Sequence, residues 1–101
     1  MKAHEVLEQG KQLLTQRGEQ RDSKEGERSM ARAVRAFWIL YGDRILKRGY
    51  MSETEGWEFM SVLKKSRKAH GVYTPDDYLD DVNYAALAAE SESNWNEDTE
   101  R

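Results

Sequence analysis

Two pairs of acidic residues have the spacing that places carboxylates on one side of a helix. Glu55 and Glu58 are three residues apart, and Asp77 and Asp81 are four apart, so the members of each pair project in similar directions. Four carboxylates from two facing helices could hold Mg²⁺, a hard cation that prefers oxygen ligands. Acids at this spacing are also common on solvated helix surfaces, and the pattern favours that interpretation.

A second group combines both signs of charge. Lys64 and Arg67 continue an apolar helix side, and Asp77 and Asp81 share one side of the next predicted helix. Charge that continues an apolar side is expected to be partly buried, and buried charge has to be paired. We expect either an interhelical salt-bridge network, which the pattern favours, or a polar pocket. In such a pocket the two cations would hold phosphates and the aspartates would hold metal.

Positive charge gathers on one predicted helix. Arg28, Arg32 and Arg35 recur at helical spacing, and a basic strip of this kind could bind nucleic-acid phosphates. Residues 1–90 nevertheless contain as many basic as acidic residues, and an acidic tail follows. A solvated helix face is therefore the simpler interpretation, and we do not expect nucleic acid as a partner.

The composition excludes several kinds of site. There is no cysteine, so the sequence offers no disulfide and no thiolate metal ligand. His4 and His70 are far apart, and no glycine-rich phosphate loop is present. No apolar run is long enough for a membrane span or a secretory signal.

Four amphipathic segments must position these residues. In each segment apolar residues recur every three or four positions, which is the helical period. The segments are approximately residues 2–17, 28–48, 52–70 and 74–90. No segment shows the alternation of a strand. The charged stretch at residues 18–27 has two glycines and no aliphatic residue, so it predicts a loop.

Local signals mark some of the helix ends. Ser52 followed by Glu55 is a capping-box pattern, and Thr74 followed by Pro75 suits the start of a helix. Gly49 fits a helix stop. Gly42 could end the second helix early or mark a weak turn within it.

We therefore expect an all-α fold, with a single compact domain of about four helices. The chain has 101 residues, a length that fits one domain. The domain is expected over residues 1–90, followed by a disordered acidic tail over residues 91–101. The whole formal charge of −3 lies in that tail.

Several segments resemble a family of small bacteriophage and prophage proteins of unknown function. The resemblance covers about residues 5–90, and its most specific parts are Gly26-Glu-Arg-Ser-Met30 and the Leu-Lys-x-x-Arg and Asp-x-x-x-Asp patterns. The remaining residues that carry it are Arg17, Asp22, Val34, Phe37, Gly56, Trp57, Met60 and Tyr84-Ala-Ala-Leu87. This resemblance implies a phage accessory protein that binds a host factor, in takeover or counter-defence, in the cytoplasm of a bacterial host cell.

More remotely, the chain is similar to MazG-like all-α nucleotide pyrophosphohydrolases, which bind Mg²⁺ and a nucleoside triphosphate. Those enzymes use a Glu-x-x-Glu motif and a Glu-x-x-Asp motif on helices. Glu55-Gly-Trp-Glu58 matches the first motif, and Asp77-Tyr-Leu-Asp80 approximates the second. The phage-family pattern instead points to Asp81 as the partner of Asp77, so the two resemblances disagree about the site.

The enzyme resemblance implies an alternative function, a Mg²⁺-dependent nucleotide-binding or hydrolysing domain. Its metal candidates are Glu55, Glu58, Asp77 and Asp81, and its phosphate-binding candidates are Arg28, Lys64 and Arg67. It also implies a homo-oligomer with sites shared between subunits. We expect non-catalytic binding of a host protein first and this activity second.

Overall fold

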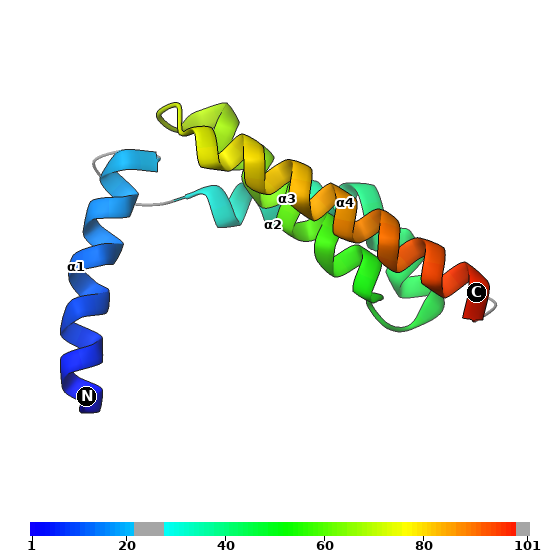
Figure 1. Cartoon of the computed structure of the whole chain (residues 1–101), viewed down its shortest axis with the longest axis horizontal. Coiled ribbons are helices and arrows are strands. Elements are labelled where there is room, and N and C mark those ends of the chain that lie inside the picture. Colours follow the sequence, from blue (N-terminus) through cyan, green and yellow to red (C-terminus); the bar gives the residue numbers. More distant parts are fainter. Residues whose placement is uncertain (22–27, 99–101) are drawn as a thin grey trace.

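The computed structural model describes residues 1–21 and 28–98, with side chains described for residues 1–17 and 28–95. The described chain forms four helices, α1 (Ala3–Arg21), α2 (Ser29–Arg48), α3 (Glu53–His70) and α4 (Pro75–Asp98) (Figure 1). The predicted all-α fold is confirmed. Within the described ranges no helix has the length and apolar character needed to cross a lipid bilayer. Helix α1 continues into the predicted loop, of which residues 22–27 lie outside the described residues.

Side-chain and glycine signals set the ends of the central helices. The Ser52 hydroxyl accepts from the Glu55 backbone N–H at 3.2 Å, and the Glu55 carboxylate accepts from the Ser52 N–H at 2.8 Å. This is the predicted capping box at the start of α3. Gly49 follows α2 with φ of 92°, a left-handed conformation that glycine adopts without strain.

Helix α2 passes Gly42 without a break. A Cβ atom at this position would lie 2.7 Å from Cε3 of Trp38, so the indole ring lies directly against the glycine. Glycine in a helix interior costs about 1 kcal/mol relative to alanine. Helix propensity disfavours glycine at position 42, but only a residue without a side chain leaves room there for the Trp38 ring.

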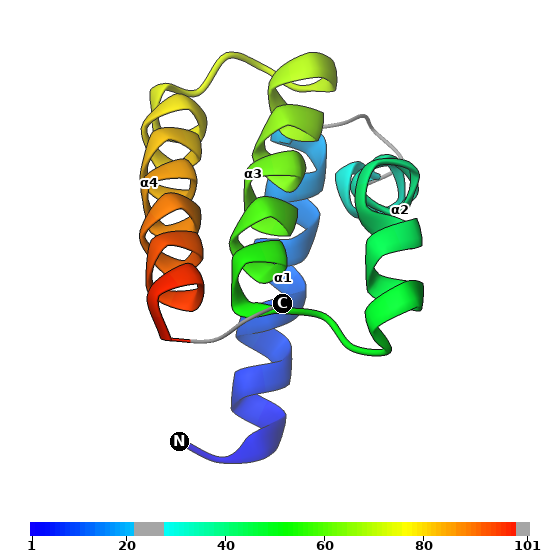
Figure 2. The ribbon, with the colours of Figure 1, turned by 90° about the vertical axis from the view of Figure 1, so that its right-hand side faces the viewer.

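Helices α2, α3 and α4 form a three-helix body with α3 in the middle. Figure 2 shows α3 between the other two helices. An aromatic cluster joins α2 to α3, because the buried Phe37 ring lies 5.1 Å from the Tyr41 ring and 5.4 Å from the Phe59 ring, centroid to centroid. Stacked Trp57 and Tyr84 rings join α3 to α4, with centroids 6.0 Å apart.

Helix α1 stands apart from this body (Figure 1) and packs extensively against none of the other helices. Its apolar residues are exposed, with exposed fractions of 48–72% at Val6, Leu7, Leu13 and Leu14. The radius of gyration is 16.4 Å, whereas a compact domain of this length has about 13 Å. The compact part of the chain is therefore α2–α4.

Helix α4 turns its polar side inward. Asp77 and Asp81 are buried against α3. On the opposite side of the helix, Leu79 and Val82 are 61% and 67% exposed. We define the outer stripe of α4 as the exposed residues Leu79, Val82, Ala86 and Ala89.

Helix α4 also continues past residue 90, where the sequence predicts the tail to begin. The Ser91 hydroxyl lies 2.9 Å from the Thr54 hydroxyl, and the Trp95 ring lies 6.4 Å from the Tyr50 ring. These contacts hold the helix on the body up to Trp95. The last part of the predicted disordered tail, residues 99–101, lies outside the described residues.

Candidate functional site

The α3–α4 interface contains a charged seam, which we define as Lys64, Lys65 and Lys68 on α3 with Asp77 and Asp81 on α4. Lys64 Nζ lies 3.5 Å from Asp77 Oδ1 and 2.9 Å from Asp80 Oδ2. The side chains of Lys64 and Asp77 are only 8% and 3% exposed. Buried charge at this depth is tolerated because each ion has an opposite charge beside it.

Asp81 is the most heavily partnered acid of the seam. Its Oδ2 lies 3.0 Å from Lys65 Nζ and 2.8 Å from Lys68 Nζ, and its Oδ1 accepts from the Ser61 hydroxyl. Burial by itself raises the pKa of Asp81, but the hydrogen bonds from Lys68, Ser61 and Lys65 outweigh it and lower that pKa to about 2. Asp81 is therefore an ionised acceptor with its oxygens already engaged.

The two glutamates of the predicted metal set lie on the other side of α3, against α2. Arg48 donates to both carboxylate oxygens of Glu55, at 2.7 and 2.9 Å. This guanidinium is the main reason that the pKa of Glu55 falls to about 2. Glu58 accepts from the Tyr41 hydroxyl at 3.0 Å. Burial and, next, this hydrogen bond raise the pKa of Tyr41.

The four predicted metal ligands thus lie at two different interfaces. Glu55 and Glu58 face α2, while Asp77 and Asp81 reach α3 from α4. Among the described residues, no three histidine, aspartate or glutamate side chains come together in a way that could hold a metal ion. This arrangement does not fit the Mg²⁺ site that the enzyme resemblance implies.

The predicted phosphate-binding residues come from the start of α2 and from α3. Lys64 is held within the seam by two aspartates. Arg28 is exposed at the residue before α2, and Arg67 is half-buried on α3. Ser66 donates to the Ser29 carbonyl at 3.0 Å, so the chain neighbours of these two arginines are in contact. Among the predicted partners, Lys64 and Asp77 are in direct contact.

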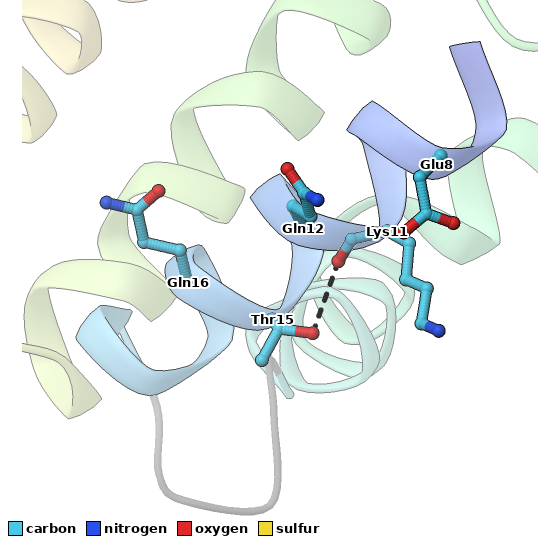
Figure 3. A pocket seen from close by; sticks show the side chains of 5 residues that line it. All are labelled: Glu8, Lys11, Gln12, Thr15 and Gln16. Carbon is cyan, nitrogen blue, oxygen red and sulfur yellow. Dashed lines mark hydrogen bonds between the residues drawn. The ribbon is translucent and has the colours of Figure 1, made fainter. Parts of the chain in front are cut away.

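A hollow of the surface lies along α1 and has a volume of about 370 Å³. Figure 3 shows the polar side chains that line it, Glu8, Lys11, Gln12, Thr15 and Gln16. All are exposed, and Thr15 is tied back to its own helix by donating to the Lys11 carbonyl at 3.2 Å. None of the residues that line the hollow therefore supplies a buried polar group.

An exposed apolar row on α2 is the feature that the sequence interpretation missed. Met30, Val34 and Trp38, spaced four residues apart, are 48%, 40% and 46% exposed. They belong to one helical stripe with Phe37 and Ile45, both of which are buried. The width of that stripe was the available signal, because it is broader than the strip that α3 alone covers.

The chain was compared with protein-family models, curated proteins and solved structures, and no match was found.

Proposed function

We propose that this chain is a non-catalytic binding protein whose partner is another protein. In the bacteriophage setting that its sequence resemblance implies, the partner is a host factor in the bacterial cytoplasm. The single observation that carries the proposal is the exposed apolar row Met30, Val34 and Trp38 on α2. Three large apolar side chains at this spacing are the kind of anchor surface that an amphipathic helix recognises.

The charges around the row indicate the chemistry of the partner. Helix α2 carries five basic residues and one acidic residue, so its formal charge is +5 − 1 = +4. These residues are Arg32, Arg35, Arg44, Lys47, Arg48 and Asp43, of which Arg48 is already paired with Glu55 on α3. A partner helix that presents an apolar stripe bordered by acids would complement this surface, and opposite charge would also speed its association.

The state of the polar residues supports a non-catalytic role. A metal-dependent hydrolase needs carboxylates that are free to bind the metal and cations that are free to bind phosphate. Here Asp77 and Asp81 accept from lysines of α3, and Glu55 accepts from Arg48. The groups that catalysis would need are used to join the three helices.

The test is capture from bacterial host lysate on immobilised full-length chain, comparing Val34→Glu with Val72→Glu. Both valines are exposed, but Val72 lies in the connection between α3 and α4 and not on α2. We expect Val34→Glu to lower the captured partner about tenfold or more, because a carboxylate would be buried without a partner. We expect Val72→Glu to leave capture unchanged.

Two results would contradict the proposal. One is equal capture, or repeated absence of capture, with all three chains. The other is Mg²⁺-dependent hydrolysis of a nucleoside triphosphate by the purified chain, which would establish the alternative function.

A further inference from the structure

We propose that two copies of this chain exchange α1, so that α1 of each copy packs along the outer stripe of α4 of the other. The surfaces involved are separate from the α2 row of the proposed function. The partner here is a second copy of the same chain.

The first observation is that α1 has an apolar side without a cover. Val6, Leu7, Leu13 and Leu14 are exposed, and α1 packs extensively against no helix of its own chain. Of the residues that line the hollow, Glu8, Gln12 and Thr15 lie on the opposite side of the helix by their spacing, and Lys11 lies at the border with the apolar side. Most helices in proteins are stabilised by packing of the apolar side rather than by propensity. Helix α1 therefore needs a partner surface.

The second observation is the form of the outer stripe. Leu79, Val82, Ala86 and Ala89 follow one another at intervals of three, four and three residues, which is the spacing of a coiled-coil seam. All four are exposed. The two alanines add little bulk, so another helix axis can approach α4 closely.

The third observation is that the charges beside the two stripes are opposite. On α1, Lys11 and Arg17 lie three or four residues from the apolar positions, whereas Glu5 and Glu8 adjoin the polar side. On α4, Asp76 lies three residues before Leu79 of the outer stripe, and Glu90 lies four residues after Ala86. Helix α4 contains no lysine or arginine at all. Opposite charge favours α1 against α4 and disfavours α4 against a second α4.

The pairing closes on itself. If α1 of one copy covers α4 of the other, two-fold symmetry places the second α1 on the first α4. The apolar side of α1 and the outer stripe of α4 are then covered in both copies, and neither of these two surfaces is left to recruit a third chain. The exchange therefore predicts a dimer rather than a filament.

The first test is the mass of the full chain in solution by light scattering after size exclusion. We expect twice the chain mass of 11.8 kDa, and a single chain mass for Leu14→Glu and for Val82→Glu. Val72→Glu is the matched exposed control and should stay dimeric. A wild-type monomer at high micromolar concentration, or a dimer that both charged variants leave intact, would overturn the proposal.

The second test identifies which helix surfaces meet. The chain has no native cysteine, so any disulfide must form between the introduced cysteines. Leu7→Cys and Val82→Cys chains are mixed under oxidising conditions, with Glu8→Cys and Val82→Cys as the control mixture. We expect a disulfide-linked heterodimer from the first mixture and much less from the second. Linkage of Val82→Cys chains to one another only, or equal linkage in both mixtures, would refute the exchange.

These outcomes are distinguishable from failure of the proposed function. Val34→Glu should remain a dimer because the α2 row lies outside the exchanged surfaces. A wild-type dimer that captures no host protein would refute only the proposed function, and a wild-type monomer that still captures its partner would refute only the exchange.

Discussion

The two sides of α4 differ in a way that reverses the usual pattern of a surface helix. Its inner side contacts α3 through Asp77 and Asp81, which are almost completely buried. Its outer side presents Leu79 and Val82 to solvent. In most surface helices the apolar side is buried and the charged side is exposed. Charge pairing with α3, together with the Tyr84–Trp57 stacking and the buried Ala88, therefore determines which way α4 faces.

The inner and outer sides of α4 also contribute differently to folding stability and to association. Removing one partner of a buried ion pair leaves an uncompensated charge, which is strongly destabilising. Substituting an exposed apolar side chain changes the stability of the monomer little. Substitutions on the inner side should therefore change folding, and substitutions on the outer side should change association.

The largest expected effect is that of Asp77→Ala. This variant leaves Lys64 buried with Asp80 as its remaining partner, and Asp80 is much more exposed. We expect a loss of about 3 kcal/mol in the free energy of unfolding, at the lower end of the range for broken buried pairs. Urea denaturation measures it. Asp76→Ala, at the exposed neighbouring position, should cost less than about 1 kcal/mol; equal costs would show that the seam does not stabilise the fold.

The next effect is on the pH dependence of stability. The pKa of Asp81 is lowered to about 2 in the folded state, so its stabilising effect is present above the unfolded pKa, near 4, and disappears as the pH falls through the folded value. We expect Asp81→Asn to remove about 2 kcal/mol from the loss of stability between about pH 5 and about pH 2. Urea denaturation across this range is the measurement. An unchanged pH profile would contradict the pairing of Asp81 with its lysines.

A smaller effect is expected at the C-terminal part of α4. Trp95→Ala removes the contact with the Tyr50 ring, and aromatic pairs contribute about 1 kcal/mol. We expect a loss of that size in thermal or urea unfolding. Asn94→Ala, at an exposed position, is the matched control. Identical stability of the two variants would mean that the domain ends near residue 90, as the sequence predicts.

The smallest effect is expected for Val82→Ala on the outer side. In solution too dilute for the proposed dimer to form, the free energy of unfolding should change by less than about 0.5 kcal/mol. The same substitution should weaken the dimer at higher concentration because it removes part of the outer stripe. A large loss of stability in dilute solution would show that α1 covers Val82 within one chain.

Much of the fold follows from the sequence alone. The helical period located all four helices, and the Ser52–Glu55 capping box and Gly49 occur where predicted. Local patterns succeed here because each depends on contacts within a few residues. The continuation of α4 beyond residue 90 depends on Thr54 and Tyr50, which are distant in sequence, so composition gave no sign of it.

The candidate site was less predictable than the fold. The sequence placed Lys64 and Arg67 near Asp77 and Asp81, and the structure contains the Lys64–Asp77 pair. The sequence also placed Glu55 and Glu58 with the aspartates. In the structure the two glutamates instead form hydrogen bonds with Arg48 and Tyr41 of α2. Helical spacing shows which residues share a side of one helix. It does not show which neighbouring helix that side will meet.

The central claim is that the seam of α3 and α4 forms within one chain, while α1 is ordered by a second copy. Hydrogen exchange of the full chain at low and high micromolar concentration tests both parts in one measurement. We predict that amides of α1 become protected only at high concentration, and that amides of α3 and α4 beside the seam are protected equally at both. Unprotected α1 amides at every concentration, or α3 and α4 amides that exchange as fast as those of α1, would contradict the account.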